Sequence, residues 1–129
     1  MKRFLGVALS VVLWVGCSQA FATETPPEGQ GAVRHVVVVW LKEPGRQARD
    51  RYLELSRSLA ALPGVVSYHA GPPIPSARSV VDNSYDVAVV AVLKDRQALK
   101  AYNANPERQK VIDAMRPLVQ KVVVYDFAD

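Results

Sequence analysis

Two histidines are the side chains best suited to acid–base chemistry in this 129-residue sequence. His35 stands at the start of an apolar run that ends at Leu41, and His69 follows Tyr68 in a second, shorter run. An imidazole can act as a base or as a hydrogen-bond donor near neutral pH. Each histidine also has a structural interpretation, because a histidine that begins or ends a strand can simply bond to the backbone. Both interpretations stay open, and both residues are candidates for ligand binding.

Other reactive combinations do not stand out in the sequence. It contains one cysteine, Cys17, and neither an HExxH nor a CxxC spacing, so a zinc site is not expected. Ser84 and Asp86 could join a histidine in a hydrolytic triad, but the glycines of a nucleophile elbow do not flank Ser84. A glycine-rich phosphate-binding motif is also missing. We therefore expect neither a metal nor an organic cofactor.

The elements that must position these residues follow from the spacing of apolar side chains and from turn residues. Apolar runs predict strands, and apolar positions three and four residues apart predict helices. Asp95 suits a helix N-cap, and Asn105-Pro106 is expected to bend the second helical stretch. The strands are expected at 34–41, 65–70, 85–93 and 121–127, and the helices at 47–62, 96–104 and 107–119.

This order, β-α-β-β-α-β, is that of the ferredoxin-like α+β fold, in which the helices cover one face of a four-stranded antiparallel sheet. Three of the expected strands are nevertheless apolar on both faces. A monomer would expose a patch of roughly several hundred Å² of apolar side chains, which soluble monomers rarely do. We therefore expect a homodimer in which the sheet face without His35 meets the partner.

Four short segments occur together and in order: His35-Val-Val-Val-Val, Val80-Val-Asp-Asn-Ser-Tyr-Asp86, Ala98-Leu-Lys-Ala-Tyr102 followed by Asn105-Pro106, and Val122-Val-Val-Tyr-Asp-Phe127. In these segments the chain resembles the stress-responsive A/B barrel (Dabb) family. The resemblance implies a dimeric α/β barrel built from a domain at 33–128. It does not imply one activity, since members range from stress-associated proteins to plant polyketide cyclases.

The resemblance also implies roles for individual residues. In the cyclase members a histidine on the first strand lines the pocket and a tyrosine on the second helical stretch assists the chemistry. His35 and Tyr102 match these positions and are the candidate catalytic residues. The His-Pro-x-His segment that carries the main acid–base histidine reads Asn105-Pro106-Glu107-Arg108 here. Arg108 cannot take up a proton at neutral pH but can hold an anion bidentately; alternatively it is a solvated helix residue, and Tyr102 a core residue.

Two hypotheses about function follow. The first is an exported homodimer that binds a small, partly apolar ligand in a pocket between sheet and helices, through His35, His69, Tyr102 and Arg108. The second is an enzyme of the same fold class, either a polyketide-cyclase-like lyase or a monooxygenase, that acts through His35 and Tyr102. Replacement of the His-Pro-x-His histidines favours the first hypothesis.

The first 22 residues have the pattern of an export signal. Two basic residues precede an apolar run, and Ala20-Phe21-Ala22 fits the signal-peptidase site, so cleavage before Thr23 is expected. Residues 23–32 are rich in proline and glycine and are expected to form a flexible tether. The mature protein would then be periplasmic or secreted.

Cys17 offers an alternative, because Trp-Val-Gly-Cys loosely resembles a lipobox whose cysteine becomes lipidated. Unless Cys17 carries a lipid, we expect no membrane partner. Loss of the two basic residues with the signal lowers the formal charge from +4 to +2. Arginines in the expected first helix alternate with acids, as on a solvated face, so nucleic-acid binding is not expected.

Overall fold

The computed structural model describes residues 31–129. The expected export signal at 1–22, Cys17 and most of the 23–32 tether lie outside the described residues. Within them the chain follows the predicted order of strands and helices, and two of the helices continue into short 3₁₀ turns. The elements are β1 (Val33–Leu41), α1 (Arg46–Arg57), η1 (Ser58–Ala61), β2 (Val65–Gly71), β3 (Val87–Leu93), α2 (Arg96–Ala104), α3 (Pro106–Met115), η2 (Arg116–Leu118) and β4 (Val119–Ala128).

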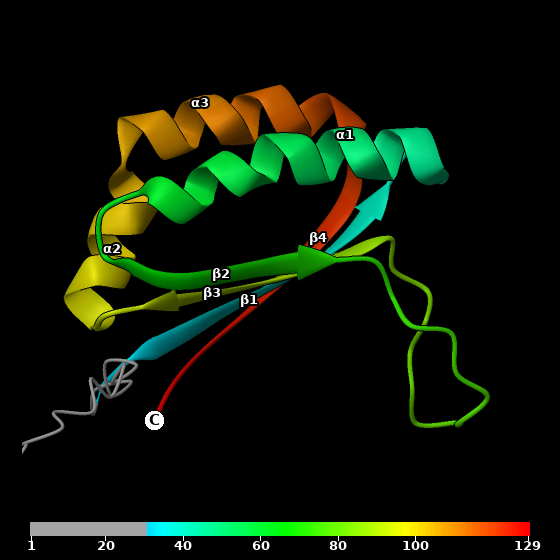
Figure 1. Ribbon diagram of the computed structural model, residues 1–129, viewed down its shortest axis with the longest axis horizontal. Coiled ribbons are helices and arrows are strands. Elements are labelled where there is room, and N and C mark those ends of the chain that lie inside the picture. The colour runs from blue at the N-terminus through cyan, green and yellow to red at the C-terminus, as the bar shows by residue number, and fades with distance from the viewer. Residues whose placement is uncertain (1–30) are drawn as a thin grey trace, which may run out of the picture.

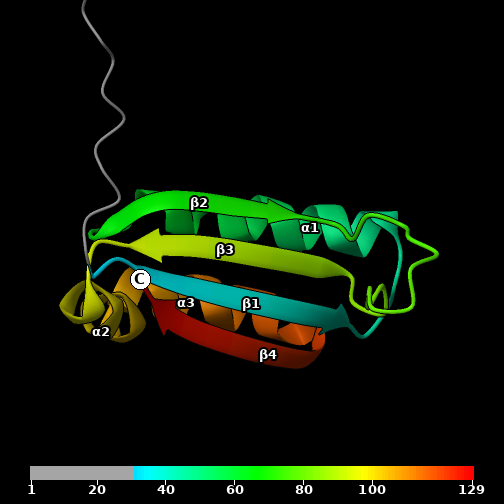
Figure 2. The same cartoon turned by 90° about the horizontal axis from the view of Figure 1, so that it is seen from below.

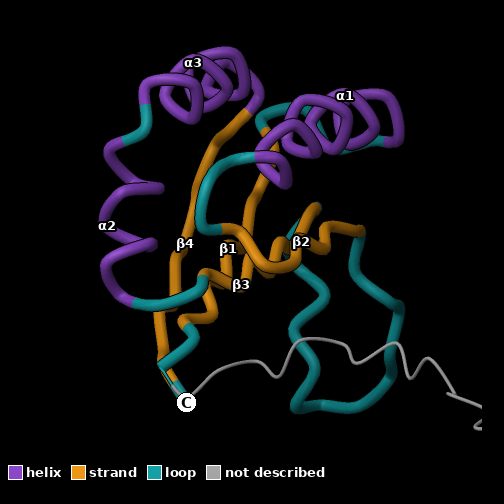
Figure 3. Tube along the Cα trace, turned by 60° about the vertical axis from the view of Figure 1, so that its left-hand side comes forward, coloured by secondary structure: helices purple, strands orange, loops and turns teal. Residues whose placement is uncertain are grey.

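The strands form one antiparallel four-stranded sheet in the order β2-β3-β1-β4 (Figure 2). Helices α1 and α3 lie side by side on one face of the sheet, and α2 stands at the end where β1 begins (Figures 1 and 3). β1 and β4 are neighbours although they come from opposite ends of the domain, and their register sets His35 opposite Asp126. The predicted ferredoxin-like α+β fold is confirmed.

The core lies between the helical layer and the sheet. Alternate side chains of β1 point towards the helices, so Val39 and Leu41 are buried together with Tyr52 and Leu53 of α1. Met115 packs against the same cluster from the end of α3. Burial of each such side chain stabilises the fold by about 1.5–3 kcal/mol. His35 lies on this helix-covered face, as expected from the strand alternation.

Two helices end earlier than their apolar pattern predicts. α1 changes at Ser58 into a 3₁₀ turn that still buries Leu59. The chain then turns at Gly64, where φ is +83° and an added Cβ would lie 2.9 Å from the Cβ of Ala98, so only glycine fits. α3 becomes a 3₁₀ turn before Pro117, because proline has no backbone N–H to continue α-helical bonding.

Side-chain caps fix the bend between α2 and α3. Asp95 accepts a hydrogen bond from the backbone N–H of Ala98 at 2.7 Å, as predicted for an N-cap. Asn105 ends α2 and caps α3, accepting from the backbone N–H groups two and three residues later at 2.8 and 3.2 Å. Pro106 follows at the first helical position, where no N–H is needed. The bend therefore fixes the start of α3, and with it the position of Arg108.

The opposite face of the sheet carries no helix and faces the viewer in Figure 2. Cross-strand register places Val36 of β1 beside Val90 of β3 and Tyr125 of β4 on this face. Tyr125 and Phe127 are 60% and 52% exposed. We call this surface the open face. Soluble proteins rarely leave a continuous apolar surface of this kind exposed to water.

The connection between β2 and β3, residues 72–86, projects on the side away from the helices (Figures 1 and 3). The Asp86 carboxylate accepts a hydrogen bond from the backbone N–H of Leu41 at 2.8 Å, and the Trp40 indole donates to Ser84 at 3.2 Å. The Asp86 backbone N–H also donates to the carbonyl of Val39 at 2.9 Å, and β3 begins at Val87, two residues later than predicted. Ser84 and Asp86 thus anchor the end of β1, and within residues 31–129 neither bonds to a histidine.

Candidate functional site

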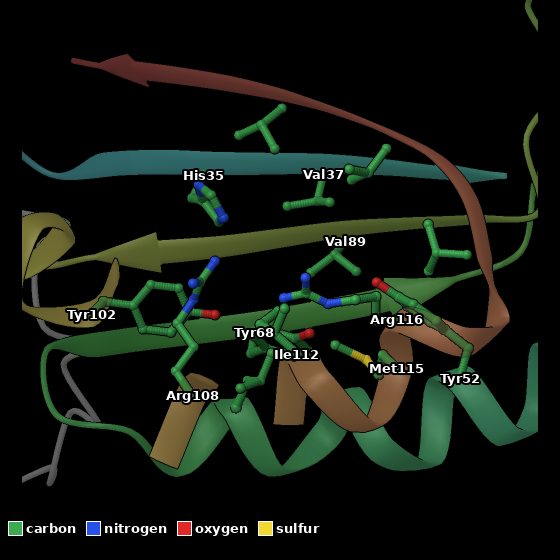
Figure 4. A pocket seen from close by; sticks show the side chains of 14 residues that line it. His35, Val37, Tyr52, Tyr68, Val89, Tyr102, Arg108, Ile112, Met115 and Arg116 are labelled. Atoms are coloured by element: carbon green, nitrogen blue, oxygen red, sulfur yellow. The ribbon is translucent and has the colours of Figure 1, made fainter. Parts of the chain in front are cut away.

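A cavity of about 380 Å³ lies between the helix-covered face of the sheet and α3 (Figure 4). Its lining is mostly apolar, with polar groups from one histidine, three tyrosines and two arginines. Pockets for small molecules have this composition and volumes of roughly 300–1,000 Å³. The cavity therefore suits a compact ligand. The lining residues are His35, Val37, Tyr52, Leu59, Tyr68, Val89, Tyr102, Arg108, Ile112, Met115, Arg116, Val119, Val122 and Val124.

His35 projects from β1 into this cavity and is 4% exposed. Its Nδ1 lies 2.6 Å from Oδ1 of Asp126, the residue opposite it on β4. A carboxylate at this distance orients the imidazole and leaves Nε2 as the ring nitrogen available to a ligand. The partner of His35 is thus a side chain of the neighbouring strand and not the backbone.

Tyr102 reaches the same cavity from α2. Its side chain is 2% exposed, and its ring meets that of His35 edge to face, with centroids 5.8 Å apart and planes at 70°. Burial raises the pKa of Tyr102, and a hydrogen bond to Arg108 and its charge partly oppose this effect. The phenol therefore keeps its proton at neutral pH. It can donate or accept a hydrogen bond but cannot act as a phenolate base.

Arg108 lies beside Tyr102, with its guanidinium carbon 4.8 Å from the ring centroid. In Figure 4 the guanidinium points into the cavity, towards His35 and the Tyr102 hydroxyl. Its Nε is the one buried side-chain nitrogen or oxygen without a hydrogen-bond partner among residues 31–129. In that part of the chain no acidic side chain lines the cavity. Arg108 is therefore a pocket residue and not a solvated one.

Two more tyrosines and a second arginine complete the polar lining. Burial raises the pKa of Tyr52 to about 12, and burial also raises the pKa of Tyr68. Both side chains are therefore neutral phenols at physiological pH. Arg116 enters the cavity on the side away from Tyr102 (Figure 4) and donates a hydrogen bond to Asp113 at 2.9 Å. Its charge is thus already paired.

His69 lies apart from the other candidates. It belongs to β2, is exposed, and pairs with Val90 on the open face. The β2–β3 register shifts between Val65 and Ser67, so a bulge reverses the direction of every later side chain in β2. Tyr68 therefore points into the cavity and His69 away from it. The expectation that His69 joins His35, Tyr102 and Arg108 in one ligand site is wrong for this cavity.

Asp126 is the most important residue that sequence reasoning missed. In a ferredoxin-like sheet the first and last strands are antiparallel neighbours, so a residue near the start of one lies opposite a residue near the end of the other. That rule could have paired Asp126 with His35. Tyr52 and Tyr68 carried no such signal, because both occupy positions typical of core residues. Arg116 carried none either.

Two other features concern only the part of the chain that the structure describes. No group of three or more histidine, cysteine, aspartate or glutamate side chains there lies in an arrangement that could hold a metal ion. None of the helices between residues 31 and 129 is both long and apolar enough to cross a bilayer.

The fold and the cavity together define a class of protein, a ferredoxin-like α+β domain with a cavity between its sheet and its helices. Residues 33–129 match the sequence profile of the Stress Responsive A/B Barrel Domain (Dabb). The chain belongs to this family, as its short sequence segments predicted.

Solved structures with the same fold cover most of the chain. A Dabb family protein with a ferredoxin-like fold from Mesorhizobium loti is 25% identical, over 78% of this chain and 98% of that one, with a TM-score of 0.64. A dimeric ferredoxin-like protein of unknown function from Thermobifida fusca is 23% identical, over 78% and 93%, with a TM-score of 0.63. Hydroxynitrile lyase from Passiflora edulis is 14% identical, over 78% and 95%, with a TM-score of 0.67. No curated protein sequence matches the chain.

Proposed function

We propose that this protein is an exported homodimer that binds a small, partly apolar molecule in the cavity between the sheet and α3. The observation that carries the proposal is the convergence of His35, Tyr102 and Arg108 at one end of a largely apolar cavity of about 380 Å³. The apolar lining would bury the body of a ligand, which stabilises a complex by about 25 cal/mol per Å². The polar groups would orient the opposite end of the ligand.

The open face supports the homodimer. Val36, Val90 and Tyr125 form an apolar row across β3, β1 and β4 on a surface that no helix covers. A second copy offers the same apolar surface and can meet it through a two-fold axis. The Thermobifida fusca structure with the same fold is described as dimeric, which is in keeping with this arrangement.

The sequence pattern of residues 1–22 supports export. A basic start, an apolar run too short to span a bilayer comfortably and an Ala-x-Ala end are the three parts of a secretory signal. The protein would meet its ligand in the periplasm or outside the cell. Lipidation at Cys17 is the alternative form of the same proposal.

Native mass spectrometry of the mature protein purified from its own host tests the binding function. The expected spectrum is that of a dimer that retains a small molecule. Val124→Trp should abolish that retention, because Val124 lines the cavity while being 46% exposed, so an indole can cover the cavity without disturbing the core. Val66→Trp is the matched control, since Val66 is 52% exposed and does not line the cavity. Retention by Val124→Trp would place the molecule elsewhere and refute the pocket.

The His35–Asp126 pair favours a second candidate function, that of a lyase. An imidazole held by a carboxylate through Nδ1 can take a proton from a carbon acid at Nε2. The negative charge left behind would move to the carbonyl oxygen, where the neutral Tyr102 phenol can donate a hydrogen bond. Hydroxynitrile lyase from Passiflora edulis shares the fold, so the scaffold is compatible with such chemistry.

A double substitution separates the two functions. Asn105→His with Arg108→His replaces Asn105-Pro106-Glu107-Arg108 by the His-Pro-x-His segment of the cyclase members. If the variant turns over a linear polyketide model compound and the parent does not, the parent is a former catalyst in which the acid–base histidine has been replaced. Turnover by the parent itself would establish the lyase. Inactivity of both proteins, together with a retained small molecule in the parent, is the result expected for a binding protein.

A further inference from the structure

We infer that the ligand of this cavity is a small apolar monocarboxylic acid whose carboxylate is bound by Arg108. The inference rests on the proposed binding function and adds to it the charge of the ligand. It follows from three independent features of the cavity: the unpaired donor of Arg108, the charge of the surrounding groups, and the apolar wall opposite them.

The first feature is the guanidinium itself. Its Nε is buried and has no hydrogen-bond partner, although the neighbouring polar groups of the cavity are close by. A buried donor on a charged group is costly unless a partner binds it. The guanidinium carbon lies 4.8 Å from the centroid of the Tyr102 ring, so the ring holds the cation beside the cavity while Nε keeps no protein partner. Nε–H and one Nη–H form a fork that fits the two oxygens of a carboxylate.

The second feature is the charge of the lining. No carboxylate among the described residues lines the cavity, and two acids that bond to lining residues are thereby already paired. Asp126 lies 2.6 Å from His35, and Asp113 accepts from Arg116 at 2.9 Å. The tyrosine hydroxyls are neutral donors. The charge of the lining therefore favours binding of an anion over binding of a cation.

The third feature is the wall that a ligand would contact beyond its acid group. Val37 and Val89 of the sheet face Ile112 and Met115 of α3 across the cavity. These side chains can bury only hydrocarbon or an aromatic ring. A second acid group at that end would compete with Asp113 for Arg116, so the wall favours a ligand with one carboxylate. A volume of about 380 Å³ limits the body to a compact one.

Matched probes test the charge directly. Phenylbutyrate and its neutral counterpart phenylbutanol have the same apolar body and differ in the acid group. Binding of both is measured by isothermal titration calorimetry to the mature dimer, to Arg108→Gln and to Arg116→Gln, with folding checked by circular dichroism. We expect the wild type to prefer phenylbutyrate, and Arg108→Gln to weaken its binding by roughly ten- to 100-fold with little change for phenylbutanol. Arg116→Gln should change neither by more than about threefold, since its charge is already paired.

Each other outcome overturns the inference in a distinguishable way. Equal affinity of the wild type for both probes would leave a functioning pocket without the predicted preference for an acid. A loss of both probes in a folded Arg108→Gln would make Arg108 a packing residue of the pocket. A larger loss of phenylbutyrate binding in Arg116→Gln than in Arg108→Gln would show that Arg116, and not Arg108, binds the carboxylate. Failure of the wild type to bind either probe would refute the pocket function, and the inference with it.

Discussion

Replacing Tyr52 by phenylalanine should make the fold more resistant to alkali. Tyr52 is 5% exposed, and burial raises the pKa of its phenol to about 12 from an ordinary 10.0. The unfolded chain has its phenol in water, so above pH 10 it loses the proton before the folded chain does. This difference of about two in pKa corresponds to about 3 kcal/mol of unfolding free energy. The stabilisation is fully present below pH 10 and is lost as the pH rises to about 12; phenylalanine has no proton to lose.

Urea unfolding followed by circular dichroism measures this effect at a series of pH values from neutral to 12. The protein concentration is held constant, because the stability of the proposed dimer would depend on it. Near neutral pH, the unfolding free energy of Tyr52→Phe should differ from that of the wild type by no more than about 1 kcal/mol. By pH 12, where the folded phenol is half ionised, the wild type should have lost about 2 kcal/mol more than Tyr52→Phe. Tyr85→Phe, a change in the 72–86 connection, should follow the wild type. Parallel losses in the wild type and Tyr52→Phe would refute the burial of this phenol.

Three further predictions concern assembly, export and the polar end of the cavity. The mature protein should sediment as a dimer at micromolar concentration, and a stable monomer there would contradict our account of the open face. Residues 1–22 should export a reporter that works only outside the cytoplasm, with mature protein beginning at Thr23; a blocked N-terminus and membrane partitioning would instead indicate a lipid on Cys17. His35→Ala and Tyr102→Phe should each weaken binding of the retained ligand about 5- to 150-fold while the dimer persists; unchanged affinity in both would remove these residues from the site.

The fold could be predicted because its signals are local. The apolar steps along α1, the Asp95 cap and the proline at 106 each specify structure within a few residues, and all agree with one topology. The errors lie where a distant group intervenes. β3 starts late at the point where the Asp86 side chain bonds to the backbone N–H of Leu41, and that contact spans 45 residues. No local pattern carries such information.

The site was only partly predictable, because it depends on which way individual side chains point. His35 was placed correctly, since β1 alternates without interruption up to its pairing irregularity near Trp40. His69 was placed wrongly because a bulge near Val66 reverses β2, and bulges leave little trace in sequence. The resemblance located Tyr102 and Arg108, but their meeting with His35, and the unpaired Nε, depend on how α2 and α3 pack against the sheet.

The pairing of His35 with Asp126 also has a consequence for the order in which the domain is completed. The two residues are 91 positions apart, so their contact forms late in a chain synthesised from its N-terminus. Among the described residues, every buried apolar side chain of the core comes before β4. A nascent domain can therefore bury most of its core while the long edge of β1 is still unpaired and His35 still lacks its carboxylate. Ligand binding would then mark a domain whose last strand is in place.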